Sequence, residues 1–386
     1  MDFRKLGLLP WILLAILLGV TCGHFFPHWA VRVFATFNSV FSAFLQFMIP
    51  LIIVGLVTPA IADISRGAGK LLLITVAIAY LDTVFAGFTS YFTSTTLFPS
   101  MIAKTGSLAD VAAAEDAQAF FTIGIPPILD VMSALVISFI LGLGIAHFKA
   151  HTLKSFFQEF KDIVARVIAK VILPLLPVYI FGIFLNMTHT GQAMRVIRVF
   201  LSIILVIFAL HILLLVFQYC IAGAISRKNP FKALWNMLPA YFTALGTSSS
   251  AATIPITLSS SVKNGVSEET AGFVIPLCAT IHLSGSTLKI VACAVALMLM
   301  EGLQPSLGMF SGFILMLGIM MVAAPGVPGG AIMAALGILG SMLGFGKEEQ
   351  ALMIALYITM DNFGTACNVT GDGAIALIID RIRGNR

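Results

Sequence analysis

The sequence predicts an all-α membrane protein with eight transmembrane helices and two re-entrant helical hairpins. Of its 386 residues, 59% are hydrophobic and only 10% are charged, whereas an ordinary soluble domain has about 25% charged residues. Apolar runs long enough to cross a bilayer recur along the whole chain. A soluble globular fold is excluded because too few polar residues remain to cover its core, and the same composition excludes a disordered chain.

Each predicted span is a run of about 20 apolar residues, the length that crosses the hydrocarbon core of a bilayer. The eight runs cover residues 6–25, 35–62, 71–97, 131–148, 171–190, 199–225, 270–300 and 350–379. The third, seventh and eighth runs contain isolated ionisable residues, which makes them the candidates for function because charges inside a membrane are costly.

Two further apolar stretches, 233–262 and 302–346, have Ser, Gly or Pro clusters at their centres. This pattern fits a helical hairpin that enters and leaves the membrane on one side, with its irregular tip buried in protein or facing water. An ordinary span with a kink is the alternative. Each hairpin candidate precedes a span rich in Gly and polar residues, which favours an inverted repeat.

The distribution of Lys and Arg predicts the orientation. With the N-terminus in the cytoplasm, 16 of the 22 basic residues lie in cytoplasmic segments, five lie outside and Lys289 lies within a span. Basic residues concentrate on the cytoplasmic side of membrane proteins. We therefore expect both termini in the cytoplasm, and we relate the net charge of +5 to orientation in the lipid bilayer, not to nucleic-acid binding.

The last span carries a polar stripe made of Asp361, Thr365, Asn368 and Asp372. Their spacing places all four on one helical face. One carboxylate can hold a substrate ammonium, the amide can donate to a substrate carboxylate, and the second carboxylate can bind a hard cation. We expect a bound zwitterion and a metal ion to neutralise the stripe; a polar seam between helices is the alternative.

The two hairpin tips also carry chemistry. The first reads Gly-Thr-Ser-Ser-Ser-Ala-Ala-Thr-Ile-Pro over 246–255 and offers hydroxyls and the free N–H groups of a half-helix, which can bind a carboxylate. The second reads Ala-Pro-Gly-Val-Pro-Gly-Gly over 324–330, where Pro and Gly break the helix and permit close backbone approach.

Together, the Ser-rich tip, the Pro-Gly-Val-Pro-Gly-Gly tip and the Asn368–Asp372 ending resemble the glutamate transporter family (dicarboxylate/amino acid:cation symporters), in a divergent prokaryotic form. The resemblance covers nearly the whole chain. It implies a homotrimer in a bacterial inner membrane that works as an elevator, with the second hairpin as the extracellular gate. The implied scaffold comprises 1–70 and 126–225. The implied transport part comprises 71–98 and 229–386, with hairpins at 229–265 and 304–346 and spans at 268–300 and 348–382.

The resemblance also implies residue roles. Asp361 would hold the substrate amino group, Asn368 its α-carboxylate, and Asp372 a sodium ion. The remaining implied substrate residues are Ser249, Ser250, Ser286, Gly326, Val327 and Thr365.

Two departures from the family bear on the substrate. The family arginine that pairs with an acidic side chain falls at Gly364, and the alternative arginine position holds Ser248. Without a guanidinium, a second substrate carboxylate has no bidentate partner. We therefore expect a neutral substrate such as serine, threonine or alanine, with an acidic amino acid or dicarboxylate as the alternative.

The seventh span departs further, because the family's Asn-Met-Asp-Gly-Thr is replaced by His282-Leu-Ser-Gly-Ser286. Ser284 replaces a sodium-binding aspartate and His282 replaces an asparagine. Both nevertheless join Asn368 and Asp372 as candidate sodium ligands.

Ion coupling has three candidate residues, Asp82, His282 and Lys289. A buried pair between Asp82 and Lys289 would replace one sodium ion. A proton on His282 or Asp82 is the rival hypothesis, since histidine titrates near neutrality. Alternatively, Lys289 extends to the membrane interface.

Sodium-coupled transport is the function expected. An intramembrane hydrolase would instead need Ser284 or the Ser248 cluster to lie within hydrogen-bond reach of His282, together with an oxyanion hole. A channel is the third class.

Overall fold

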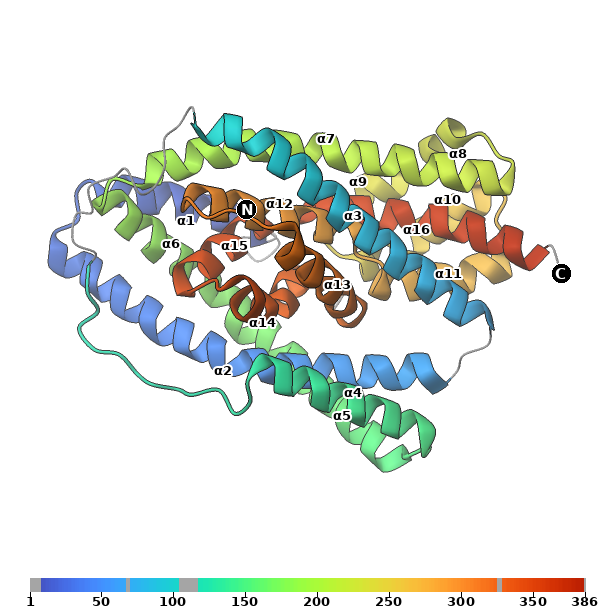
Figure 1. Cartoon of the computed structure of the whole chain (residues 1–386), viewed down its shortest axis with the longest axis horizontal. Coiled ribbons are helices and arrows are strands. Elements are labelled where there is room, and N and C mark those ends of the chain that lie inside the picture. Colours follow the sequence, from blue (N-terminus) through green and yellow to red (C-terminus); the bar gives the residue numbers. More distant parts are fainter. Residues whose placement is uncertain (1–7, 67–69, 104–116, 325–327, 385–386) are drawn as a thin grey trace, which may run out of the picture.

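The computed structural model describes residues 8–66, 70–103, 117–324 and 328–384, and within these ranges the chain is helical, with no strand (Figure 1). The helices of the first half are α1 (Leu8–Gly23), α2 (His28–Arg66), α3 (Lys70–Ala103), α4 (Val131–His147), α5 (His151–Val167), α6 (Leu173–His189) and α7 (Ala193–Ser226). Those of the second half are α8 (Pro230–Asn236), α9 (Leu238–Thr247), α10 (Ser250–Lys263), α11 (Glu268–Ile281), α12 (Ser284–Met300), α13 (Leu307–Ala323), α14 (Gly330–Leu343), α15 (Lys347–Thr359) and α16 (Asp361–Gly384).

Many of these helices have the length and composition needed to cross a membrane. Five stretches of the described chain meet both criteria: His28–Asp63, Lys70–Ile102, His151–His189, Val196–Ser226 and Glu268–Met300. Four shorter helices, α1, α4, α13 and α14, are equally apolar in character. Within the described residues, each apolar run that we predicted as a span is largely helical; that eight of them cross the membrane stays a prediction.

Helix α5 was not predicted. Its sequence alternates apolar and charged residues, so it lacks the uncharged run by which spans are recognised. Phe157 and Val164 are buried, whereas most of its charged side chains are exposed. A π-helical turn (Ile168–Ile172) joins α5 to α6 without a loop.

The helices form two groups that pack on different parts of the molecule. Helices α4, α5 and α6 each pack on α2, and α1 packs on α6. Helices α3 and α7 pack instead on α12 and α16 (Figure 1). Residues 284–298 of α12 are all buried, so this helix forms the centre of the molecule.

The two segments predicted as hairpins contain pairs of packed helices, α9 with α10 and α13 with α14; that they are re-entrant stays a prediction. In the first, Ser248 has a left-handed backbone (φ 51°) and Ser249 caps α10 through its side chain. In the second, Ser306 caps α13, and Gly329 has φ 73° just before α14 begins. A left-handed conformation is costly for a residue with a side chain, so the backbone at Ser248 is held in place by its surroundings.

Two of the predicted spans, 270–300 and 350–379, are interrupted. The break between α11 and α12 is at His282 and Leu283, and His282 has an extended backbone. The break between α15 and α16 is at Met360. A break frees backbone N–H and C=O groups, which need new partners when they are buried.

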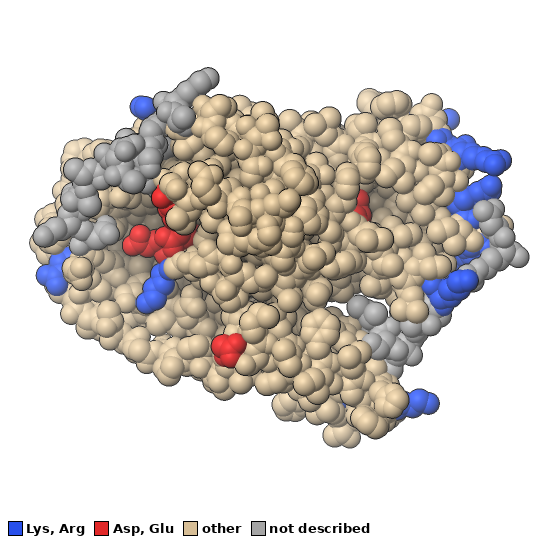
Figure 2. Space-filling view, viewed as in Figure 1, with Lys and Arg blue, Asp and Glu red and all other residues tan. Residues whose placement is uncertain are grey.

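Charged side chains are unevenly distributed on the surface. Figure 2 shows most of the visible Lys and Arg side chains gathered at the end of the molecule formed by α8 and the C-terminal end of α16. Lys232 belongs to α8, Arg381 and Arg383 belong to α16, and Arg227 and Lys228 lie in the turn between α7 and α8. This is the end that the sequence places in the cytoplasm.

Candidate functional site

A largely buried polar cluster lies where α3, α7, α12, α15 and the first half of α16 meet. We call this set of side chains the polar cluster; it comprises Asp82, His211, Gln218, His282, Ser284, Ser286, Lys289, Tyr357, Asp361, Asn368 and Asp372. Polar groups inside a membrane protein are rare and usually mark substrate or ion pathways.

The first part of the cluster is an ion pair between α12 and α16. Lys289 Nζ donates to Asp361 Oδ1 at 3.0 Å, and the Lys289 side chain is 0% exposed. The same ammonium donates to the Met360 carbonyl at 3.3 Å and lies 3.6 Å from the centroid of the Tyr357 ring. An ammonium over an aromatic face is attracted by the electrons of the ring, so Lys289 has three partners.

The helix break explains why both charges are tolerated there. Met360 lies at the C-terminal end of α15, and Asp361 begins α16. The C-terminal end of a helix carries a partial negative charge and the N-terminal end a partial positive charge. Lys289 thus faces the end that favours a cation, and Asp361 lies at the end that favours an anion.

Glycine makes this arrangement possible. A Cβ atom on Gly364 would lie 2.6 Å from Lys289 Nζ and 2.8 Å from Lys289 Cε. A Cβ atom on Gly285 would lie 2.7 Å from Cys367 Cβ. The two glycines therefore permit α12 and α16 to approach closely enough for the ion pair to form.

The predicted pair between Asp82 and Lys289 is wrong. Lys289 pairs with Asp361, whereas Asp82 accepts a hydrogen bond from Gln218 and lies 2.7 Å from His282 Nε2. The alternative in which Lys289 reaches the membrane interface is also wrong, because the side chain is fully buried.

The second part of the cluster is a triad of Asp82, His282 and Asp372. His282 Nε2 lies 2.7 Å from Asp82 Oδ2, and His282 Nδ1 lies 2.8 Å from Asp372 Oδ1. Each of these contacts requires a hydrogen atom between nitrogen and oxygen. Two hydrogens shared among one imidazole and two carboxylates leave the triad with one net negative charge, wherever each proton sits.

Asn368 stabilises the second helix break. Its Oδ1 accepts hydrogen bonds from the backbone N–H groups of Gly285 (2.9 Å) and Ser286 (3.3 Å), which begin α12. Its Nδ2 donates to Ser286 Oγ at 3.1 Å, and Ser286 Oγ also accepts from Tyr357 at 3.0 Å. Asn368 thus caps α12 from another helix. Its side-chain amide carries a second N–H group besides the one that donates to Ser286 Oγ.

Each hairpin tip contacts the start of α16. Ser248 Oγ donates to Asn362 Oδ1 at 2.6 Å, and Asn362 Nδ2 donates to the Leu245 carbonyl at 2.7 Å. From the second hairpin, the Gly329 N–H donates to Asp361 Oδ2 at 2.8 Å. Two consecutive residues of α16 therefore bind the two tips.

The predicted tip residues stand as follows. Ser249 is the N-cap of α10, and Ser250 is buried at its first position. Gly326 and Val327 lie outside the described residues.

The polar stripe on α16 is confirmed as buried along its length, at Asp361, Thr365, Asn368 and Asp372. The expectation that bound ligands neutralise its two carboxylates stays a prediction, and the structure adds a protein partner for each of them. Asp361 pairs with Lys289 and Asp372 with His282. The sequence analysis did not foresee that the protein supplies a basic partner for each carboxylate.

Most of the predicted sodium ligands bind other protein groups. Asn368 Oδ1 caps α12, both ring nitrogens of His282 contact carboxylates, and Ser284 Oγ accepts from Gln218 at 3.2 Å. Asp372 Oδ2 differs, since it is buried without a hydrogen-bond partner among the described residues, as are Gln218 Oε1 and Thr370 Oγ1. Oxygen atoms of this kind are the ligands that hard cations prefer.

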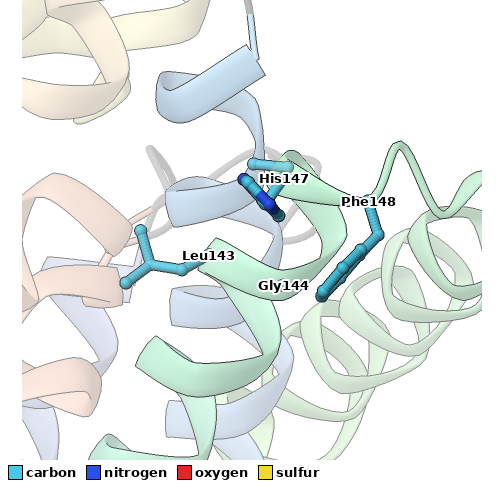
Figure 3. A pocket seen from close by; sticks show the side chains of 5 residues that line it. Leu143, Gly144, His147 and Phe148 are labelled. Atoms are coloured by element: carbon cyan, nitrogen blue, oxygen red, sulfur yellow. The ribbon is translucent and has the colours of Figure 1, made fainter.

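One cavity adjoins the site, and a second hollow lies away from it. The first, of about 270 Å³, is lined by Asp82, Gln218 and Gly371 together with apolar residues of α3, α7 and α16, so it adjoins the triad. Figure 3 shows the other, a hollow at the C-terminal end of α4 beside Leu143, His147 and Phe148. None of its lining residues belongs to the polar cluster.

Comparison with known proteins identifies the family. Residues 8–382 match the sodium:dicarboxylate symporter family. The chain belongs to this family. The chain is 25% identical to the serine/threonine transporter SstT of Acinetobacter baumannii, and the match covers 98% of this chain and 97% of the relative. It is 28% identical to the excitatory amino acid transporter 3 of Mus musculus and 27% identical to an excitatory amino acid transporter of Caenorhabditis elegans. Those matches cover 66% and 65% of this chain, and about half of each relative, 49% and 50%.

Family membership and geometry together exclude the hydrolase alternative. Members of this family are transporters and not enzymes. The chain is an integral membrane protein with several apolar helices long enough to cross the bilayer. Both His282 ring nitrogens contact carboxylates, and the Ser248 hydroxyl donates to Asn362. Neither Ser284 nor Ser248 is therefore paired with His282 as a nucleophile with its base.

Several residues in or beside the polar cluster were missed by sequence reasoning. Gln218 and Tyr219 lie in an apolar span, and Gln218 donates to both Asp82 and Ser284. A glutamine within an uncharged run is a signal that a search for ionisable residues overlooks. Tyr357 and Asn362 flank the second break and were missed for the same reason.

Proposed function

We propose that this symporter carries a small neutral amino acid of the serine, threonine or alanine type together with sodium. The observation that carries the proposal is that both hairpin tips meet α16 at Asp361 and Asn362, beside the buried charges. A full-length relative named as a serine/threonine transporter supports the substrate class. Sodium coupling is supported by the family to which the chain belongs.

The substrate would bind between the two tips. Asp361 would bind its ammonium, and the second N–H of the Asn368 amide would bind its carboxylate, aided by the start of α10 at Ser249 and Ser250. Thr365 lies one turn after Asp361 on the same buried face. Ser286, Gly326 and Val327 complete the proposed set.

A neutral side chain is favoured because no arginine is present at positions 248 or 364. Lys289 does bring a cation to the site, but its ammonium is engaged by Asp361. A second substrate carboxylate would therefore have to compete for a cation already in use. An acidic amino acid or dicarboxylate is the alternative that the experiment below separates.

Two sites could account for ion coupling. For sodium we propose Asp372 Oδ2, a carboxylate oxygen that is buried without a hydrogen-bond partner among the described residues. The triad at His282 would take the place of a second sodium, since its imidazole already lies between two carboxylates. If a proton is carried as well, the cavity beside Asp82 offers it a route, because the Asp82 side chain is 16% exposed.

For the working assembly, we propose a homotrimer in a bacterial inner membrane with eight spans, both termini in the cytoplasm and an elevator motion. We revise one boundary: α7 packs on α12 and α16 and supplies Gln218 to the cluster, which favours placing it with the moving part, not with the scaffold of 126–225. The basic end seen in Figure 2 supports the orientation.

An uptake experiment tests this function. Purified protein in proteoliposomes is given a panel of labelled amino acids and dicarboxylates, while sodium, proton and potassium gradients are varied separately. We expect sodium-dependent uptake of serine, threonine or alanine. Aspartate strongly preferred over serine would overturn the substrate class, and uptake indifferent to sodium would overturn the coupling.

A further inference from the structure

Both carboxylate oxygens of Asp361 are already in use. Oδ1 accepts from Lys289 Nζ at 3.0 Å, and Oδ2 accepts from the Gly329 N–H at 2.8 Å. Each oxygen can accept a further hydrogen bond, but a substrate ammonium bound there would lie close to the Lys289 ammonium, and two like charges beside one buried carboxylate repel each other. The Lys289 ammonium is the chemically equivalent group, so the two ammonium groups compete for the same oxygen.

Lys289 can release Asp361 without losing all of its partners. Its ammonium also contacts the Met360 carbonyl at 3.3 Å and the Tyr357 ring at 3.6 Å. Both partners are neutral, and the carbonyl lies at the negative end of α15. A cation held in this way remains stabilised when a zwitterion, which brings no net charge, enters beside it.

We infer that Lys289 is an internal counter-ion that takes the place of the substrate ammonium on Asp361 whenever the carrier is empty. This inference rests on the proposed function, in which Asp361 binds the substrate amine. The pair leaves no lone buried carboxylate in the empty carrier, and a lone buried charge is strongly unfavourable. The empty carrier can then return across the membrane without an external cation at this position.

The inference separates two activities of one protein. Exchange of internal for external amino acid uses only the loaded carrier, in which the substrate ammonium neutralises Asp361. Net uptake also needs the empty carrier to return, which requires Lys289. Loss of Lys289 should therefore impair net uptake and leave exchange largely intact.

The test compares Lys289→Met with Lys154→Met in proteoliposomes. Lys154 pairs with Asp63 near the surface, where the Asp63 side chain is 51% exposed, so it is a matched control for loss of one ammonium. For Lys289→Met we expect the ratio of net uptake to exchange to fall at least about tenfold, because an unpaired buried carboxylate is costly. The control should keep the ratio of the unmodified protein.

Two results would overturn the inference. An unchanged ratio in folded Lys289→Met protein would show that the empty carrier returns without the lysine. An equal loss of exchange and net uptake would show that Lys289 serves the loaded carrier instead.

A second variant covers the case in which Lys289→Met does not fold. Gly364→Ala keeps the charge but places a Cβ atom 2.6 Å from Lys289 Nζ, at the flexible end of that side chain. It should push the ammonium away from Asp361 and lower the same ratio. An unchanged ratio in this variant would also overturn the inference. Failure of the unmodified protein to exchange any amino acid would instead refute the proposed function.

Discussion

Lys289 on α12 and Asp361 on α16 form a buried ion pair at the break between α15 and α16, with 3.0 Å between nitrogen and oxygen. The pair joins three elements, because Asp361 also binds the second hairpin through Gly329. It depends on Gly364, since a side chain there would occupy the space of the ammonium. The ion pair is thus a property of the packing of two helices and cannot be assigned to either residue alone.

Removing the carboxylate of this pair should destabilise the protein. In Asp361→Asn, the Lys289 ammonium stays buried without its counter-charge, and breaking a buried pair in this way costs about 3–5 kcal/mol. Chemical unfolding in detergent measures the change, and amino-acid uptake should be lost. Asp63→Asn is the control, because its pair with Lys154 is partly exposed and such pairs contribute about 0–1 kcal/mol. Equal effects of the two changes would contradict the prediction.

Replacing the histidine of the triad should change the ion requirement. In His282→Asn, Asp82 and Asp372 lose the group that lies between them, and two nearby carboxylates need a cation. We expect about one additional sodium ion per transported amino acid. The sodium-to-substrate ratio, obtained from reversal potentials in proteoliposomes, measures this. His147→Asn, in the hollow on α4, should keep the original ratio. If His282→Asn also keeps the original sodium-to-substrate ratio, the role given to the triad is refuted.

An arginine at position 364 should conflict with Lys289. Gly364→Arg brings a guanidinium against the ammonium, and like charges at short range in a buried site repel strongly. Transport should therefore be lost in the single variant. It should return when Lys289→Met is added, with a higher ratio of aspartate to serine uptake, because the remaining guanidinium can pair with a second carboxylate. A single variant that transports normally would contradict this prediction.

Glu301, in the turn after α12, should give the protein a pH-dependent stability. Burial, followed by the nearby Glu349 carboxylate, raises the pKa of Glu301 to about 7 from its usual 4.5. The folded state therefore binds a proton more tightly than the unfolded state, and stability should fall as pH rises from about 4.5 to about 7. For a half-exposed group, we expect about 1 kcal/mol after allowing for screening by solvent.

Glu301→Gln checks this assignment. The variant cannot titrate at this position, so its unfolding free energy should vary less between pH 5 and pH 7 than that of the unmodified protein. Identical pH profiles for the two proteins would show that another group is responsible.

Much of the helical framework could be predicted because membrane helices are marked by long uncharged runs. The stripe from Asp361 to Asp372 and the two hairpin tips could be predicted because polar groups in such runs are costly and stand out. Helix α5 could not be found in this way, because its charges hide an amphipathic pattern.

The choice of partners could not be predicted from spacing. Sequence spacing does not decide whether Lys289 pairs with Asp82 or with Asp361. The choice depends on how α12 crosses α16 at Gly285 and Gly364. The break at Met360 also matters, because it offers a carbonyl to the same ammonium. Such contacts arise between segments about 70 residues apart, where periodicity within one helix carries no information.

The central claim is that Asp361 binds the amino group of the substrate. The most direct test compares L-serine with glycerate, which has a hydroxyl in place of the ammonium. Both are offered as unlabelled competitors of sodium-driven serine uptake in proteoliposomes. We predict that serine competes at least about 100-fold better, because glycerate cannot displace Lys289 from the carboxylate or replace its charge. Competition of equal strength would contradict the account.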